Sequence, residues 1–185
     1  MKPDETRHVP KLTGPRRYLS PMTAEDAELY TQWLNDQVVT EGLAVATKNI
    51  TLAGEREYIA KGAVEHSYSV VARDTNRLIG NVALVDLDYQ ERTAEIGVFI
   101  GDRDYWGQGY GAEAMGLLMA YAFDVLNIRN IWLRVFDFNQ RAITSYLRLG
   151  FREVGRRRMA VRRRGREYDM VFMDILDEEF RESAP

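Results

Sequence analysis

Two glycines stand where a strand-like segment leads into a helix-like one, a place suited to binding phosphate. An apolar run over residues 96–100 precedes Gly109 and Gly111, and a long apolar pattern follows them. The first turn of a helix has unpaired N–H groups and a partial positive charge, so it attracts anions. Glycine lets the backbone approach an anion because it has no Cβ. A tight turn without a ligand explains two glycines equally well, so the spacing alone leaves both interpretations open.

The same spacing matches the fingerprint of dinucleotide-binding proteins. Gly109, Gly111 and Ala114 fit it literally, and Asp137 follows the next expected strand, where an acid could bind a ribose. However, the strands expected before the turn form an antiparallel hairpin, and too little chain follows to complete a doubly wound sheet. These two features argue against a dinucleotide-binding protein. A Walker-type phosphate loop is excluded because no Lys follows the glycines.

A second group of chemically capable residues lies downstream, where Asn139 and Tyr146 precede Gly150 and Phe151. Asn139 stands at the start of an expected helix, and Tyr146 lies within that helix. Taken singly, an asparagine there is typical of a helix cap. A tyrosine there is typical of a partly buried packing residue. Each residue alone therefore favours a structural role.

Apolar periodicity and turn residues predict the elements that must position these groups. The expected strands cover residues 16–20, 68–72, 78–87, 93–100, 130–135, 151–161 and 167–175. The expected helices cover residues 27–34, 52–64, 109–126 and 140–149, and residues 42–49 are expected as a loop. Thr23 and Asp26 form a candidate capping box for the first helix, and Gly150 is a typical residue just past a helix end. The alternating order indicates an α/β chain.

The composition is that of an ordinary globular domain. Of 185 residues, 45% are hydrophobic and 29% are charged, which suits one domain with a real core. We expect a flexible arm over residues 1–14, one domain over residues 15–177 and a tail over residues 178–185. No stretch resembles a signal peptide or a membrane helix, so we expect a cytoplasmic protein that does not act at a membrane.

Several chemistries are excluded by what the sequence lacks. There is no cysteine, which rules out disulfides, thiolate metal sites and a cysteine nucleophile. Two histidines, His8 and His66, are too few and too far apart for a histidine-rich metal site, so no metal is expected. The net charge of −3 argues against a general electrostatic grip on nucleic acid.

Taken together, the glycine turn, the following helix and strand, and Asn139 with Tyr146 before Gly150 resemble the GNAT superfamily of acyl-CoA-dependent N-acyltransferases. The resemblance extends from Arg16 to about Leu176. The opening run, from Leu19 through Thr23 and Asp26 to Trp33-Leu34-Asn35-Asp36, resembles the subgroup that contains ribosomal-protein N-terminal acetyltransferases and spermidine acetyltransferases. One departure is Trp106, since the superfamily turn usually starts with Gln or Arg.

The resemblance implies a fold and a co-substrate. The fold is a single α/β (α+β) domain, with a mixed, mostly antiparallel sheet, helices on both faces and a splayed central strand pair. The co-substrate is acetyl-CoA, whose pantetheine arm would meet the backbone of Val98, Phe99 and Ile100 and a hydrogen bond from Asn139. The pyrophosphate would be wrapped, mainly by backbone N–H groups, by Trp106, Gly107, Gln108, Gly109, Tyr110, Gly111 and Ala112.

The implied reaction is direct transfer of the acetyl group to a primary amine, which needs no covalent enzyme intermediate. Tyr146 would face the sulfur and protonate the leaving thiolate. Glu95 would be the base, acting through water, although a solvated or arginine-paired glutamate is an equally good interpretation. An alkyl amine of pKa ~10.4 is neutral only ~0.04% of the time at pH 7, against about 14% for an α-amine. A base therefore helps alkyl amines most.

The acceptor amine stays open between a peptide N-terminus, a polyamine and another small molecule. A CoA-binding sensor without turnover is the alternative function. Nucleic acid is not an expected partner, and the sequence allows a homo-oligomer without predicting one.

Two charge clusters bear on the acceptor. An acidic group could attract a cationic amine or simply be solvated: Glu41, Asp86, Asp88 and Glu91. Arginines of the last hairpin could protect an edge strand or bind an acidic partner or ribosomal RNA: Arg156, Arg157, Arg158, Arg162, Arg163, Arg164 and Arg166.

Overall fold

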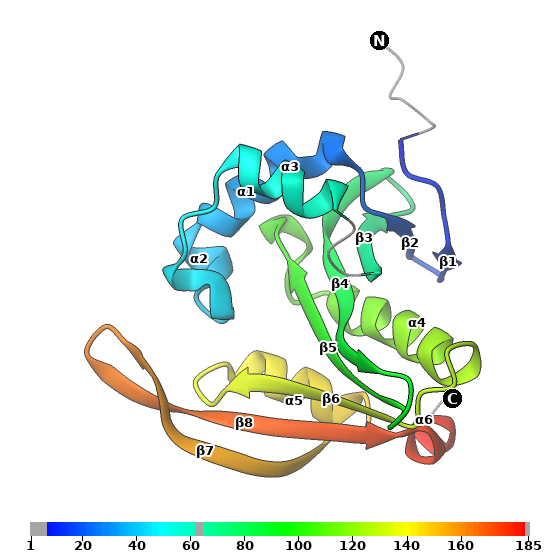
Figure 1. Ribbon diagram of the computed structural model, residues 1–185, viewed down its shortest axis with the longest axis vertical. Coiled ribbons are helices and arrows are strands. Elements are labelled where there is room, and N and C mark those ends of the chain that lie inside the picture. The colour runs from blue at the N-terminus through cyan, green and yellow to red at the C-terminus, as the bar shows by residue number, and fades with distance from the viewer. Residues whose placement is uncertain (1–6, 62–64, 184–185) are drawn as a thin grey trace. The chain divides into compact units, whose positions relative to one another are not determined.

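The computed structural model describes residues 7–61 and 65–183 (Figure 1). The chain divides into two compact units. Unit 1 comprises Met1–Leu84 and Val98–Leu118, and unit 2 comprises Val85–Gly97 and Met119–Pro185. Strand β4, strand β5 and helix α4 each run from one unit into the other, so the units are built from shared elements rather than from two successive segments.

In the described part of the chain, eight strands form one mixed sheet in the order β1-β2-β3-β4-β5-β6-β8-β7. The strands are β1 (Leu12–Thr13), β2 (Arg17–Pro21), β3 (His66–Ala72), β4 (Arg77–Asp88), β5 (Thr93–Ile100), β6 (Asn130–Phe136), β7 (Arg152–Arg163) and β8 (Arg166–Leu176). The helices are α1 (Ala27–Asn35), α2 (Gln37–Thr40), α3 (Leu52–Ala60), α4 (Tyr110–Asp124), α5 (Gln140–Arg148) and α6 (Asp177–Ser183). A sheet that is mixed and mostly antiparallel is as the sequence predicts.

Unit 1 is built on antiparallel strands. Strand β2 pairs with β1 on one side and β3 on the other, and β3 pairs with β4. Its core contains Tyr18, Tyr30, Val71 and Leu78, against which the partly buried rings of α1 and β5 pack. Helix α3 ends at Ala60, and residues 62–64 of the expected helix lie outside the described residues. A short 3-10 helix over Ala44–Thr47 lies where the sequence predicts a loop.

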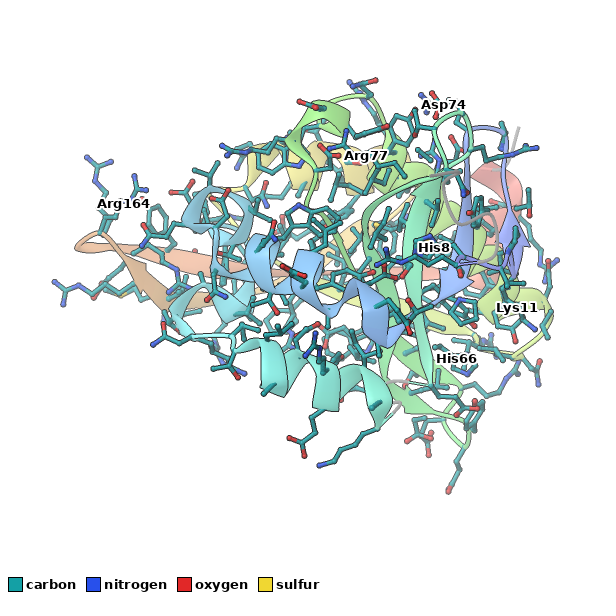
Figure 2. The ribbon with its side chains drawn as sticks, turned by 90° about the horizontal axis from the view of Figure 1, so that it is seen from above. His8, Lys11, His66, Asp74, Arg77 and Arg164 are labelled. Carbon is teal, nitrogen blue, oxygen red and sulfur yellow. The ribbon has the colours of Figure 1, made fainter. Side chains whose placement is uncertain are left out.

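The reason predicted for the start of α1 is wrong, although the helix itself is confirmed. Neither Thr23 nor Asp26 caps a backbone N–H with its side chain. Instead, the Thr23 hydroxyl donates to the buried Asp26 carboxylate at 3.0 Å, and His8 (labelled in Figure 2) hydrogen-bonds the same carboxylate at 2.8 Å. Burial would raise the pKa of Asp26, but hydrogen bonds and charges from His8, Arg7 and Thr23 outweigh it and lower the pKa below its usual value.

These contacts involve the segment that the sequence assigns to a flexible arm. His8 is buried, and Leu12–Thr13 pair with β2. The first six residues lie outside the described residues, and the flexibility of the arm and the exact domain boundaries stay predictions. Helix α6 covers part of the expected tail.

Unit 2 is organised around β6. This strand pairs in parallel with β5 over only three residues, from Thr93↔Asn130 to Glu95↔Trp132. On its other side β6 pairs along its whole length with the antiparallel strand β8. Strands β7 and β8 form a long hairpin, drawn in orange and red in Figure 1. Helix α5 ends before Gly150, whose φ of 96° is the left-handed conformation expected at a helix end.

The helices of the described ranges are all too short or too polar to cross a membrane. The cytoplasmic location stays a prediction.

Candidate active site

The glycine turn in unit 1 opens helix α4 as the sequence predicts. Gly107 and Gly109 have φ values of 74° and 80°, a left-handed conformation that other residues adopt only with strain. Gly111 lies in the first turn of α4 and has no such conformation. A Cβ there would meet Ile100 and Val98 only at 3.6 and 3.8 Å, which are ordinary contacts. Among the described residues, backbone conformation therefore accounts for glycine at positions 107 and 109. Neither conformation nor packing accounts for glycine at position 111.

Trp106 ties the turn to the strand that precedes it. Its indole Nε1 donates to the carbonyl oxygen of Ile100 at 2.7 Å, and Gln108 Nε2 donates to the Asp104 carbonyl at 2.6 Å. These side chains thus hold the turn together. Trp106 stands where the superfamily usually has Gln or Arg. The turn is still stabilised at this position, because the indole hydrogen-bonds to the Ile100 carbonyl within the protein.

The carbonyl side of the turn carries an interaction that the sequence analysis missed. Arg17, on β2, is fully buried and donates from Nη1 to the carbonyls of Gly109 at 3.0 Å and Tyr110 at 2.5 Å. Its Nη2 donates to the carboxylate of Glu113 on α4. Two adjacent arginines in a sequence suggest surface charge, so no sequence signal separates Arg17 from Arg16.

In unit 2, Glu95 is paired with an arginine. The Glu95 side chain is buried, and its two oxygens accept hydrogen bonds from Nε and Nη2 of Arg134, both at 2.8 Å. The hydrogen bonds from Arg134 to Glu95 are the main reason that the pKa of Arg134 is raised, with burial opposing and the charges of Glu95 and Asp86 adding to the rise. The arginine-paired interpretation thus describes this structure. A carboxylate oxygen can accept a second hydrogen bond, so each oxygen keeps acceptor capacity that Arg134 does not use.

Asn139 caps helix α5. Its Oδ1 accepts from the backbone N–H of Ala142 at 3.2 Å, as expected of a helix-capping asparagine. The cap uses only the oxygen. Within the described residues, the amide nitrogen of Asn139 donates no hydrogen bond, so it is available to a ligand. A structural role and a binding role are therefore compatible for this side chain.

Tyr146 lies on α5 with its ring centroid 6.1 Å from that of Phe151. Burial raises the pKa of Tyr146 to about 12, while the charge of Arg141 opposes the rise. The hydroxyl is therefore protonated at neutral pH. No described residue hydrogen-bonds to it, which leaves its proton free for donation to something outside the protein.

The structure thus brings the predicted residues together in two sets. In unit 1, Val98, Phe99 and Ile100 end the strand that leads through Trp106–Ala112 into α4. In unit 2, Glu95 lies on β5, while Asn139 and Tyr146 share α5. Arg134 was also missed by the sequence analysis. Its pairing with Glu95 depends on the parallel register of β5 and β6, which the sequence alone does not give.

Comparison with known proteins assigns the family. The acetyltransferase (GNAT) domain family matches residues 16–152. An uncharacterised N-acetyltransferase of Bacillus licheniformis is 28% identical over 182 residues, which covers 95% of this chain and 98% of that protein. A spermidine N(1)-acetyltransferase of Vibrio cholerae is 31% identical over 111 residues, covering 60% of this chain and 64% of that protein.

Solved structures show the same fold. The crystal structure of spermidine N-acetyltransferase from Vibrio cholerae in complex with CoA and spermine has a TM-score of 0.80 at 22% identity, covering 89% of this chain and 98% of that one. A GNAT-family acetyltransferase from Bacillus anthracis has a TM-score of 0.78 at 20% identity, covering 90% and 98%. The expected fold class is confirmed. With its matched domain and full-length relatives, the chain belongs to the GNAT family of N-acetyltransferases.

Proposed function

We propose that this protein transfers the acetyl group of acetyl-CoA directly to a primary amine, and that the turn over residues 106–112 holds the pyrophosphate. The observation that carries the proposal is Gly111, since the described structure offers no packing reason for glycine there. An anion approaching the N–H groups of the first helical turn would supply that reason. On this proposal the backbone of Val98, Phe99 and Ile100 and the amide nitrogen of Asn139 meet the pantetheine arm.

Substitution of Gly111 tests the phosphate assignment. Gly111→Val places a branched side chain over the first-turn N–H groups, so the affinity for CoA should fall by roughly tenfold or more. Gly116→Val is the matched control, because it adds the same side chain to the same helix, where a Cβ would meet nothing within 4 Å. Isothermal calorimetry with CoA measures both variants. An unchanged affinity in a folded Gly111→Val protein would contradict the assignment.

Proton transfer completes the proposed reaction. Tyr146 donates its hydroxyl proton to the departing thiolate, a role supported by its raised pKa of about 12 and by its lack of a hydrogen-bond partner among the described residues. Glu95 accepts the proton of the attacking amine through a water molecule on the lone pairs that Arg134 leaves open. The amine nitrogen then attacks the thioester carbon, an N–C bond forms, and the C–S bond breaks.

We place a polyamine first among the acceptors. Relatives whose names specify spermidine support this choice. So does an acidic group that would attract a polycation, formed by Asp86 and Asp88 at the end of β4 and Glu91 in the loop before β5. A peptide N-terminus is the second acceptor to be tested, because an α-amine is neutral far more often at pH 7 and depends less on a base.

The deciding experiment is an assay of thiol release from acetyl-CoA. It compares spermidine, short peptides with free N-termini and a reaction without amine, at several pH values. We expect release with spermidine and none without amine. If acetyl-CoA binds in calorimetry but no amine in a broad panel releases thiol, the protein is a CoA-binding sensor. If acetyl-CoA does not bind, the proposed function is wrong.

A further inference from the structure

Two consecutive arginines hold the carbonyl groups of the glycine turn: Arg16, just before β2, and Arg17, the first residue of that strand. Arg17 donates to the carbonyls of Gly109 and Tyr110, as described above, and Arg16 donates from Nη1 to the carbonyl of Gln108 at 3.0 Å. Three successive peptide groups of the turn are therefore bonded on their oxygen side. All of these residues belong to unit 1, and the two arginines precede the turn by more than 90 positions in the sequence.

Glu113, on the first turn of α4, binds both arginines. Its Oε1 accepts from the backbone N–H of Arg16 at 3.1 Å, and its Oε2 accepts from Arg16 Nε at 3.2 Å and from Arg17 Nη2. The ring of Tyr110 lies beneath both guanidinium groups, at 4.4 Å from Arg17 and 5.0 Å from Arg16. We call Arg16, Arg17 and Glu113 the arginine clamp.

Burying Arg17 is costly, which argues that its position serves more than packing. A charged group taken out of water loses hydration that only good partners replace. Burial lowers the pKa of Arg17 to about 10, although the neighbouring Glu113 carboxylate opposes the fall. The guanidinium remains charged at neutral pH. Its Nε atom has no hydrogen-bond partner among the described residues, so the site accepts an unsatisfied donor in order to keep the other contacts.

The geometry of the peptide bond links these contacts to phosphate binding. In a planar trans peptide the C=O and the following N–H point in opposite directions. Fixing the carbonyls of Gln108, Gly109 and Tyr110 on one side therefore fixes the N–H groups of Gly109, Tyr110 and Gly111 on the other. A cation bonded to a carbonyl also polarises the amide, which makes its N–H a stronger donor. Without the arginine hydrogen bonds, the peptide groups of the turn could rotate, because glycine allows a wide range of φ and ψ angles.

We propose that Arg17, with Arg16 and Glu113, is a positioning group for the phosphate turn: it sets the orientation of the turn's N–H groups and thereby the affinity for the pyrophosphate of acetyl-CoA. This inference rests on the proposed function. Arg17 touches neither the acetyl group nor the acceptor amine. Its effect falls on binding of the phosphate-bearing part of the co-substrate and leaves the chemical step unchanged.

The test compares two acetyl donors in the Arg17→Met variant, which keeps an unbranched apolar stem and removes the guanidinium group with its charge. Acetyl-CoA carries the pyrophosphate, and acetyl-pantetheine carries the same thioester and arm without it. We expect KM for acetyl-CoA to rise roughly 10- to 100-fold, with kcat within about threefold of wild type. The kcat and KM measured with acetyl-pantetheine should equal those of the wild type. Arg17→Lys should recover part of the affinity, because an ammonium can bond one carbonyl but cannot span both and Glu113.

Arg73→Met is the matched control. Arg73 also belongs to unit 1 and donates from Nη1 to two successive carbonyls, those of Gly14 and Pro15, but none in the turn. We expect it to leave the preference for acetyl-CoA over acetyl-pantetheine unchanged. Equal losses with both donors in Arg17→Met, or a fall in kcat at unchanged KM, would overturn the proposal.

Folding and function are separated by further measurements. Should Arg17→Met fail to fold, the double variant Arg17→Met/Glu113→Gln also removes the negative charge that Arg17 no longer balances. The half-exposed Arg16→Gln removes the guanidinium bonds to Gln108 and Glu113 and leaves Arg17 in place. A wild-type acetyl-CoA affinity in either folded variant would overturn the proposal. Calorimetry with CoA reports on the clamp even if no acceptor is found, whereas absence of CoA binding in the wild type counts against the proposed function itself.

Discussion

The two units differ in how their polar groups are satisfied. In unit 1, the turn that opens α4 is bonded on its carbonyl side by the arginine clamp, and the Trp106 indole holds its first residue. In unit 2, the Tyr146 hydroxyl and the Asn139 amide nitrogen have no described partner. On the proposed function, unit 1 would provide a rigid frame for the phosphates, while unit 2 would keep donors open for the pantetheine arm and the leaving thiolate.

The same contrast appears between arginines. Arg17 is fully buried and bonded to the turn, whereas several arginines of the β7–β8 hairpin are exposed, and Figure 2 shows Arg164 at its tip. Among the described residues, no carboxylate pairs with Arg157, Arg158 or Arg166. Exposed arginines keep their hydration and side-chain entropy, so they add little to stability. Because β7 is the last strand in the sheet order, their charge also discourages pairing with another strand.

The largest effect should follow from Tyr146→Phe, which removes only the hydroxyl. We expect kcat to fall by roughly 10²–10⁴-fold, the usual contribution of a placed proton donor, with little change in stability or in CoA affinity. Steady-state kinetics at saturating acetyl-CoA measure it, and Tyr58→Phe, an exposed tyrosine on α3, is the control. Because the pKa of Tyr146 is raised to about 12, the hydroxyl should stay protonated, and wild-type kcat should show no loss from its ionisation below about pH 11. Near-normal turnover in the folded variant would show that the hydroxyl is not the donor.

Arg17→Ala should cause the largest loss of stability. It removes a buried cation, its bonds to two carbonyls and one of the two arginine partners of Glu113, so the free energy of unfolding should fall by about 3 kcal/mol. Urea denaturation measures the change. A loss of less than about 1 kcal/mol would mean that the clamp adds little to the rigidity of unit 1, and the contrast with unit 2 would fail.

Glu95→Gln should affect alkyl amines more than α-amines. At pH 7 the loss of kcat/KM should be roughly tenfold greater with spermidine than with a peptide acceptor, because the alkyl amine is far more often protonated. The difference should shrink as the pH approaches the pKa of the amine. Glu91→Gln, in the exposed loop before β5, controls for loss of negative charge. Equal losses for both amines at every pH would show that Glu95 serves only to hold Arg134.

The smallest effect should come from the hairpin. Arg157→Gln combined with Arg158→Gln should change the free energy of unfolding by no more than about 0.5 kcal/mol, because neither side chain has a described ion pair. CoA affinity should also be unchanged. Thermal and urea denaturation with calorimetry test this. A destabilisation close to that of Arg17→Ala would show that the exposed arginines are structural after all.

Elements with strong apolar patterns were predictable from the sequence. Strand β5 spans the expected residues 93–100, and α5 ends where Gly150 predicts. Short elements such as α2 were not predicted, because four residues are too few to show a periodicity. The start of α1 was assigned for the wrong reason. The Thr23 side chain bonds to Asp26, and the Asp26 carboxylate bonds to His8, rather than to the helix backbone.

The candidate site was predictable in part for similar reasons. The glycines and Tyr146 stand in a local pattern that the sequence displays. By contrast, Arg17 meets its partners 92–96 positions away, and Arg134 meets Glu95 at a separation of 39. Such pairs depend on strand register and sheet order, which a single sequence does not specify. An arginine pairing for Glu95 was foreseeable as an alternative, but its partner was not.

The glycine turn also constrains how such a sequence can diverge during evolution. A left-handed φ at Gly107 and Gly109 makes replacement by most residues with a side chain costly, whereas the Trp106 indole ties the turn to Ile100 by a hydrogen bond. On these physical grounds, a side chain that tethers the turn should tolerate exchange better than a glycine that sets its backbone. A search pattern that demands Gln or Arg at the start of the turn would overlook this chain. A structural pattern of two left-handed glycines immediately before a helix would retrieve it whatever side chain tethers the turn.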